Sequence, residues 1–180
     1  ARAHGARHRD RRQHVAQAVY ADLRTPCTGL TDLSDIEKSP PEAPSSVLFL
    51  CGENALRSPM AESIAKHLYG DQIYADSAGV RSGTVDMLVI GVMDEIGIDL
   101  SQHNPKQIDD LMDTSFELII SLTPEAQHKA VELTRSSAAE LLYWPMPDPS
   151  VEEGNRERML AAYRELRDIL MARITEQFGE

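Results

Sequence analysis

The chain has 180 residues, of which 42% are hydrophobic, and this suits one domain with a buried core plus a tail. No apolar stretch approaches the length of a membrane span, and no segment has the pattern of a signal peptide, so we expect no membrane partner. The formal net charge is −11; residues 1–24 carry six arginines and two aspartates, a net of +4, which leaves −15 for the remainder. An acidic body argues against nucleic acid as the main partner.

The cysteine content favours a reducing compartment. The sequence holds two cysteines, Cys27 and Cys51, which are too few for the disulfide framework of a small secreted protein. We therefore expect a cytoplasmic protein with free thiols.

The first 45 residues differ in composition from the rest. Residues 1–14 are rich in arginine and histidine and nearly lack apolar side chains, which predicts disorder. Apolar residues at helical spacing predict a short amphipathic helix over residues 12–24, and prolines and serines over 38–46 predict a linker. We therefore predict an N-terminal arm, residues 1–45, followed by one domain, residues 46–180. Whether the arm docks a partner or is a passive tail stays open.

The first element of the domain joins a strand to a helix through a loop that suits anion chemistry. Residues 47–50 form an apolar run typical of a buried strand, and helical spacing begins at Ser58, with Pro59 suited to a first helical turn. Cys51 thus faces a helix N-terminus, where oriented N–H groups stabilise a thiolate and cradle a tetrahedral oxyanion. Arg57 can grip two oxygens of that anion. We expect nucleophile and anion site in one loop.

Three further elements are predicted between residues 72 and 106. Residues 72–77 form a short strand, and a helix over residues 86–95 ends at Gly97. Residues 101–106 form a turn that enters another short helix. The apolar face of the longer helix is Met87, Val89, Ile90, Met93, Ile96 and Ile98.

The remaining elements complete an alternating pattern. Residues 116–122 and 141–144 are predicted strands; Thr123 and Pro124 open a helix to residue 136, and a last helix spans 155–177. The inner stripe of that last helix is Leu160, Tyr163, Leu166, Ile169, Leu170 and Ile174. Strands alternating with helices predict an α/β fold: a four-stranded parallel sheet with helices on both faces and the anion-binding loop after the first strand. Its site belongs at the carboxyl edge of the strands, where Cys51 and Asp148 fall.

Cys51-x5-Arg57-Ser58-Pro59, with Asn54 inside the loop, resembles the signature of the low-molecular-weight protein tyrosine phosphatases, whose architecture thioredoxin-coupled arsenate reductases share. The resemblance covers residues 46–178. It implies that Ser77 supports the loop and that His103 hydrogen-bonds towards Asn54. The phosphate-binding loop it implies is Gly52, Glu53, Asn54, Ala55, Leu56, Arg57 and Ser58.

Cleavage of a phosphate ester also needs a carboxylic acid opposite the thiolate, and Asp148-Pro149 stands where the family's general acid lies. The resemblance therefore implies a protein tyrosine phosphatase acting through a cysteinyl-phosphate intermediate. Its catalytic residues would be Cys51 as nucleophile, Arg57 on the phosphate oxygens and Asp148 as acid and then base. We expect phosphorylated proteins or small phosphomonoesters as substrates, phosphate- or sulfate-type anions as ligands, and no metal or other cofactor.

Several positions depart from the family pattern. Glu53 replaces a usual glycine, where a carboxylate would repel a dianion unless it turns outward, and Leu56 replaces a second cysteine. Ser150 replaces the aromatic residue that stacks on phosphotyrosine; Trp144 either substitutes for it or belongs to the core. Ala55 lacks a side chain that would decide between phosphotyrosine, the family default, and phosphoarginine, a variant.

Two alternatives therefore stay open. A non-catalytic phosphoprotein- or oxyanion-binding domain is consistent with Glu53 and the missing aromatic residue. Arsenate reduction by the thioredoxin-linked route needs two further cysteines, and the domain contains only Cys51, so that chemistry would require an external thiol.

Overall fold

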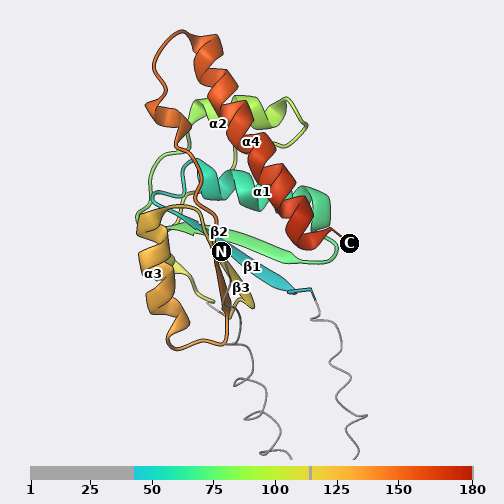
Figure 1. The fold of residues 1–180 in the computed structure, drawn as a ribbon, viewed down its shortest axis with the longest axis vertical. Coiled ribbons are helices and arrows are strands. Elements are labelled where there is room, and N and C mark those ends of the chain that lie inside the picture. Colours follow the sequence, from blue (N-terminus) through green and yellow to red (C-terminus); the bar gives the residue numbers. More distant parts are fainter. Residues whose placement is uncertain (1–42, 114, 180) are drawn as a thin grey trace, which may run out of the picture. The chain divides into compact units, whose positions relative to one another are not determined.

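The computed structural model describes residues 43–113 and 115–179 (Figure 1). The predicted arm helix and most of the predicted linker lie outside these residues, so the division of the chain at residue 45 stays a prediction. Within the described ranges, no helix is both long enough and apolar enough to cross a membrane.

A four-stranded parallel sheet forms the centre of the domain, as predicted. Its strands are β1 (Ser46–Cys51), β2 (Tyr74–Gly79), β3 (Leu118–Ser121) and β4 (Glu140–Tyr143), in the order β2-β1-β3-β4. In the register, Cys51 lies opposite Gly79, and Leu50 lies opposite both Ala78 and Ser121. The carboxyl ends of the strands therefore meet at one edge, and the residues that follow them are neighbours.

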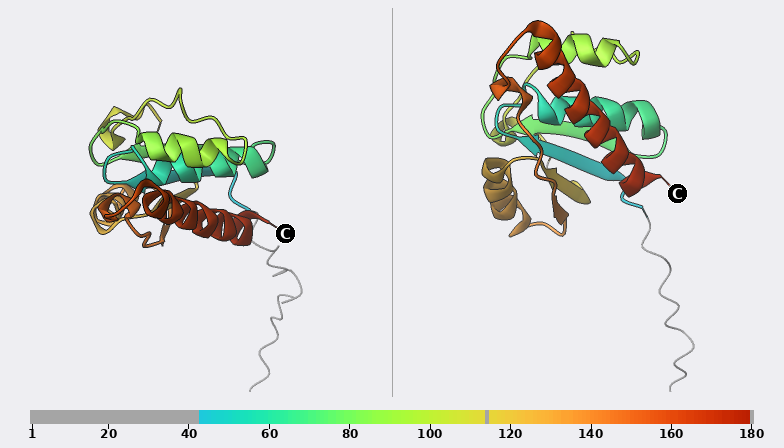
Figure 2. Two further views of the ribbon diagram at one scale, coloured as in Figure 1. Left: turned by 90° about the horizontal axis from the view of Figure 1, so that it is seen from above. Right: turned by 45° about the horizontal axis from the view of Figure 1, so that its top comes forward.

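In the described part of the chain, four α-helices cover the sheet: α1 (Arg57–Tyr69), α2 (Met87–Asp94), α3 (Pro124–Thr134) and α4 (Arg156–Phe178). Figure 1 shows α1, α2 and α4 on one side of the strands and α3 on the other, and the two views of Figure 2 show α4 running beside α1. Alternate residues of β1 serve the two sides. Val47 and Phe49 pack against the layer formed by α1, α2 and α4, whereas Leu48 and Leu50 pack towards α3.

Side-chain caps fix the helix starts that the sequence indicated. Thr123 Oγ1 accepts the N–H of Ala126 at 3.1 Å ahead of Pro124, and Asn155 Oδ1 accepts the N–H of Arg158 at 2.9 Å. Asp86 Oδ1 caps α2 through the N–H of Leu88 at 2.8 Å. Gly97 follows α2 with φ 78°, a left-handed conformation that glycine adopts without strain.

The structure corrects three details of the predicted elements. Met87 was expected on the inner face of α2, but it is 76% exposed, and Val92 is buried instead. The element after residue 106 is a single 3-10 turn, Ile108–Asp110, because Gln107 is still extended and pairs with Gly79. Phe116 lies before β3; it is buried and stacks on Tyr74 with a ring-centroid distance of 6.1 Å.

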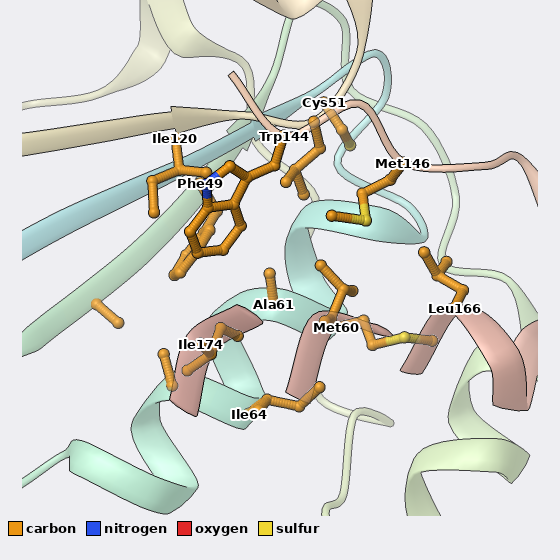
Figure 3. Packing of buried hydrophobic residues seen from close by; sticks show 14 of the residues in the cluster. Phe49, Cys51, Met60, Ala61, Ile64, Ile120, Trp144, Met146, Leu166 and Ile174 are labelled. Carbon is orange, nitrogen blue, oxygen red and sulfur yellow. The ribbon is translucent and has the colours of Figure 1, made fainter. Parts of the chain in front are cut away.

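Trp144 belongs to the core. It is 7% exposed and tilts against Phe49 with ring centroids 6.4 Å apart, above Ala61 and Ile64 of α1 (Figure 3). The guanidinium of Arg173 lies 5.8 Å from the centroid of its ring. Trp144 therefore does not replace an aromatic wall at the site.

Candidate active site

The loop between β1 and α1 surrounds the thiol of Cys51, which is 3% exposed. Its Sγ accepts the N–H of Asn54 at 3.3 Å and lies 3.0 Å from Ser58 Oγ. A backbone N–H, a hydroxyl and the N-terminus of α1 thus converge on one sulfur atom. The contact with Ser58 is the one that a thiolate-stabilising hydroxyl would make.

A second segment, residues 80–86, runs along the loop and binds its carbonyl groups. The N–H groups of Val80, Arg81 and Gly83 donate to the carbonyls of residues 51, 52 and 53 at 3.0, 2.8 and 2.7 Å. The N–H of Asp86 donates to Ala55 O at 3.1 Å. Because the loop carbonyls are directed towards this segment, the N–H groups of the loop are left to face the opposite side, where an oxyanion would bind.

Asn54 holds the loop together from below. It is fully buried and has φ 51°, a left-handed conformation that asparagine tolerates better than most residues. Its Nδ2 donates to Ser58 Oγ at 3.0 Å and to Ser77 Oγ at 2.8 Å. Its Oδ1 accepts the N–H of Lys106 at 3.0 Å and lies 3.1 Å from Nε2 of His103. The two residues that the resemblance assigned to support, Ser77 and His103, thus contact the loop through Asn54.

A charged network lies beneath this asparagine. Glu62, which is 8% exposed, contacts the hydroxyl of Ser77, binds Lys66 Nζ at 2.5 Å and lies 3.9 Å from Nδ1 of His103. Burial lowers the pKa of His103, and the negative charge of Glu62 opposes this only in part. The imidazole is therefore held in its neutral form at neutral pH, with one nitrogen towards Asn54.

Arg57 and Asp148 meet across the mouth of the loop. Nη2 of Arg57 lies 3.1 Å from Oδ2 of Asp148, and their side chains are 19% and 37% exposed. The Nε of Arg57 is buried and has no hydrogen-bond partner among the described residues. A buried N–H group without an acceptor is costly, so this atom marks a position where an anion would be bound.

Asp148 lies between β4 and a 3-10 turn, Pro149–Val151, which it caps. Its Oδ1 accepts the N–H and the hydroxyl of Ser150 at 3.0 and 2.5 Å. Burial raises the pKa of Asp148, but the hydrogen bonds from Ser150 and the charge of Arg57 outweigh it, and the net pKa lies below the ordinary value. One oxygen of this carboxylate is thus held by Ser150 and the other by Arg57.

These groups open into one pocket of ≈ 420 Å³. Its lining combines the phosphate loop, segment 80–86 and the residues that follow β3 and β4, in agreement with a site at the carboxyl edge of the sheet. No aromatic side chain lines it within the described residues. The residues lining it are Cys51, Gly52, Glu53, Ala55, Leu56, Arg57, Arg81, Thr84, Asp86, Thr123, Glu125, Asp148 and Ser150.

The structure brings the predicted site residues into one constellation; their catalytic roles stay predictions. Glu53 turns outward, with its side chain 59% exposed, towards Arg81. Leu56 is partly buried and packs against the core. Arg81, Asp86 and Glu125 were not predicted, although Arg81 and Glu125 follow shortly after strands, and the parallel order of the sheet was a signal that could have placed them at the site.

Comparisons with known proteins agree with this geometry. The family model for low molecular weight phosphotyrosine protein phosphatase matches residues 46–176. An arsenate reductase of Halalkalibacterium halodurans is 34% identical over 128 residues, which are 71% of this chain and 91% of that protein. The structure of an arsenate reductase in the phosphate binding state has a TM-score of 0.59 at 26% identity, over 75% of this chain and 97% of that one. A low molecular weight protein tyrosine phosphatase from T. tengcongensis has a TM-score of 0.60 at 25% identity, over 73% and 95%.

Proposed function

Because the chain belongs to the low molecular weight phosphotyrosine protein phosphatase family, we propose that it hydrolyses phosphomonoesters, with phosphotyrosine in proteins as substrate, through a cysteinyl-phosphate intermediate. One observation carries the proposal: a buried thiol, a carboxylate and a guanidinium whose Nε has no partner among the described residues border the same pocket. That set supplies a nucleophile, an anion clamp and a proton donor. A similar arsenate reductase has been solved in a phosphate binding state, which supports phosphate as a ligand of this loop.

In the first step the thiolate of Cys51 attacks phosphorus opposite the ester oxygen. The sulfur–phosphorus bond forms while the phosphorus–oxygen ester bond breaks, and Asp148 gives its proton to the departing alcohol oxygen. Arg57 and the N–H groups of the loop hold the other three oxygens, on which charge accumulates in the transition state. Ser58 supports the sulfur through the contact at 3.0 Å.

In the second step water attacks the phosphorus of the cysteinyl-phosphate. Asp148, now a carboxylate, takes the proton from that water, the sulfur–phosphorus bond breaks, and inorganic phosphate leaves with the thiolate restored. In the free protein Arg57 is in contact with Asp148. A bound phosphate competes with Asp148 for Arg57. Loss of that positive charge raises the pKa of Asp148, which favours the protonated form that the first step needs.

Arsenate reduction is the second candidate, because similar curated proteins are named arsenate reductase. Arsenate would bind as phosphate does. Attack by Cys51 would expel a hydroxyl group, protonated by Asp148, and a second thiol would then attack the Cys51 sulfur. A disulfide and arsenite would result, the two electrons coming from the two sulfurs. Cys51 is the one cysteine of the described part of the chain, so this route takes its second thiol from an external donor or from Cys27.

Hydrolysis of p-nitrophenyl phosphate and of a phosphotyrosine peptide tests the proposal. We expect turnover that Cys51→Ser abolishes and that Cys27→Ser, the matched control at the other cysteine, leaves unchanged. A parallel assay follows arsenite formation from arsenate with glutathione or with thioredoxin and its reductase. Turnover of arsenate without hydrolysis of either ester would contradict a phosphatase and favour the reductase. Binding of the phosphopeptide with no turnover of any substrate would identify a binding domain instead.

A further inference from the structure

The mouth of the pocket carries an arginine held between two glutamates. Arg81 Nη2 lies 3.7 Å from Glu53 Oε1, and Arg81 Nη1 binds Glu125 Oε1. We call Glu53, Arg81 and Glu125 the acidic rim. The three come from different parts of the chain: the phosphate loop, the segment after β2 and the first turn of α3.

The backbone beneath the acidic rim is fixed. The N–H of Arg81 donates to Gly52 O, and the N–H of Gly83 donates to Glu53 O. The backbone of segment 80–86 is therefore hydrogen-bonded to the loop on both sides of the peptide bond that joins Gly52 and Glu53. Glu125 reaches over Gly52 so closely that a Cβ built on this glycine would approach its Oε2 to 3.2 Å. Gly52 thus leaves room for the Glu125 carboxylate above the loop.

The charges of the pocket lining do not balance. Among the described residues that line the pocket, four carboxylates, Glu53, Asp86, Glu125 and Asp148, face two guanidinium groups, Arg57 and Arg81. The inner carboxylates are engaged elsewhere, since Asp148 binds Arg57, and Asp86 caps α2 and accepts the hydroxyl of Tyr163 at 2.6 Å. At the mouth, two carboxylates share one arginine, and their side chains are 59% and 44% exposed, so an excess negative charge is available to whatever lies above the phosphate.

We propose that the acidic rim selects phosphomonoesters that carry a positive charge beside the phosphate, with the cation resting against Glu53 and Glu125. This rests on the proposed function and deepens it. A dianion held by Arg57 and the loop leaves the net negative charge of the rim uncompensated, and a cation on the same substrate compensates that charge. The absence of aromatic lining within the described residues agrees with recognition by charge, because nothing there stacks on a flat leaving group. The cation belongs either to the leaving group itself or to a basic residue beside a phosphorylated one.

The test compares two aryl phosphates of one shape, para-(trimethylammoniomethyl)phenyl phosphate and its neutral isostere para-neopentylphenyl phosphate. We expect the wild-type kcat/KM to favour the cation about two- to thirtyfold, since two exposed ion pairs contribute on the order of 0.2–1 kcal/mol each. Glu53→Gln and Glu125→Gln should each reduce that ratio. The two phenols differ in acidity, but this difference affects the wild type and the variants equally. It therefore cancels when the cation-to-neutral ratio of kcat/KM is compared between them. Glu132→Gln, an exposed site further along α3, is the matched control and should leave the ratio unchanged.

A second arm separates the two sources of the cation. Phosphotyrosine peptides with lysine or norleucine beside the phosphorylated residue test a neighbouring charge, whereas the aryl pair tests a charge in the leaving group. A rise in salt should shrink either preference. Calorimetry with the Cys51→Ser protein measures the affinities of the two aryl phosphates, so the preference for the cation can be determined even without turnover. Hydrolysis or binding of both esters with no preference for the cation, or with a preference that the glutamine variants leave intact, would overturn the inference while leaving the phosphatase standing. Absence of turnover with a preserved binding preference would instead count against the phosphatase alone.

Discussion

Replacing Asn54 by alanine should destabilise the domain more than any other single truncation in the loop. The side chain makes four contacts, to Ser58, Ser77, the N–H of Lys106 and His103, all within 3.1 Å. Each such hydrogen bond contributes about 1 kcal/mol net, and its loss leaves buried partners unsatisfied. A left-handed alanine adds about 1 kcal/mol of backbone strain at φ 51°. We therefore expect Asn54→Ala to cost about 4–5 kcal/mol.

Asn54→Gly separates the two causes. Glycine removes the same side chain but adopts the left-handed conformation without strain, so it should be about 1 kcal/mol more stable than alanine at this position. The assay is urea unfolding, with the midpoint read at an unchanged slope. The melting temperature should fall by about 2–4 °C for each kcal/mol in a domain of this size.

Asn104→Ala is the matched control for these variants. Asn104 is an exposed asparagine next to His103, and its replacement should change the free energy of unfolding by less than about 0.5 kcal/mol. If Asn54→Gly were as stable as the wild type, the hydrogen bonds of the buried amide would contribute nothing and the reasoning would be wrong. Equal losses for glycine and alanine would remove only the argument from backbone strain.

Two predictions concern the proton donor. Asp148→Asn should slow hydrolysis of an alkyl or unactivated aryl phosphate far more than that of p-nitrophenyl phosphate, because a good leaving group needs little protonation; equal losses on both would remove Asp148 from the acid role. Ser150→Ala removes the hydroxyl that donates to Asp148 Oδ1, so the pKa of Asp148 should rise. Since the first step needs the protonated acid, the fall in kcat at high pH should then move to higher pH, and an unchanged pH profile would show that this hydroxyl does not act on the acid.

The sequence predicted the fold well because its apolar periodicity and its caps agree. Residues 47–50 and the stretch before Thr123 read as buried strands, and both lie in the centre of the sheet. The error at Met87 has a simple cause. It is the first residue of an eight-residue helix, and so short a helix needs only Val89, Val92 and Met93 against the core.

The site was predictable where one local motif defines it, and less so where distant segments meet. The loop from Cys51 to Ser58 is contiguous, so the resemblance to the family signature could name its residues. The acidic rim depends on the path of residues 80–86, which is set by N–H groups binding loop carbonyls, and no sequence pattern encodes that pairing. The contact of Arg57 with Asp148 likewise depends on how the chain turns after β4. Polar and charged residues directly after parallel strands are the sequence signal that best indicates which distant residues meet at the site.

Oxidation of Cys51 gives the last prediction. A thiolate in an anion-binding loop reacts with peroxide to a sulfenic acid, which a second thiol within reach converts to a reversible disulfide. Leu56 occupies the loop position where the resemblance places a second cysteine, and no other thiol lies in the described part of the chain. A second equivalent of peroxide should therefore carry the sulfenic acid to sulfinic acid, and added thiol should restore little activity.

Mass spectrometry after a pulse of peroxide reads this outcome directly. Inorganic phosphate should slow the loss of activity, because an anion bound by Arg57 and the loop covers the sulfur. Cys27→Ser should behave as the wild type, since Cys27 takes no part in the predicted route. A disulfide between Cys27 and Cys51 that returns full activity on reduction would contradict the prediction, and it would show that the N-terminal arm reaches the active site.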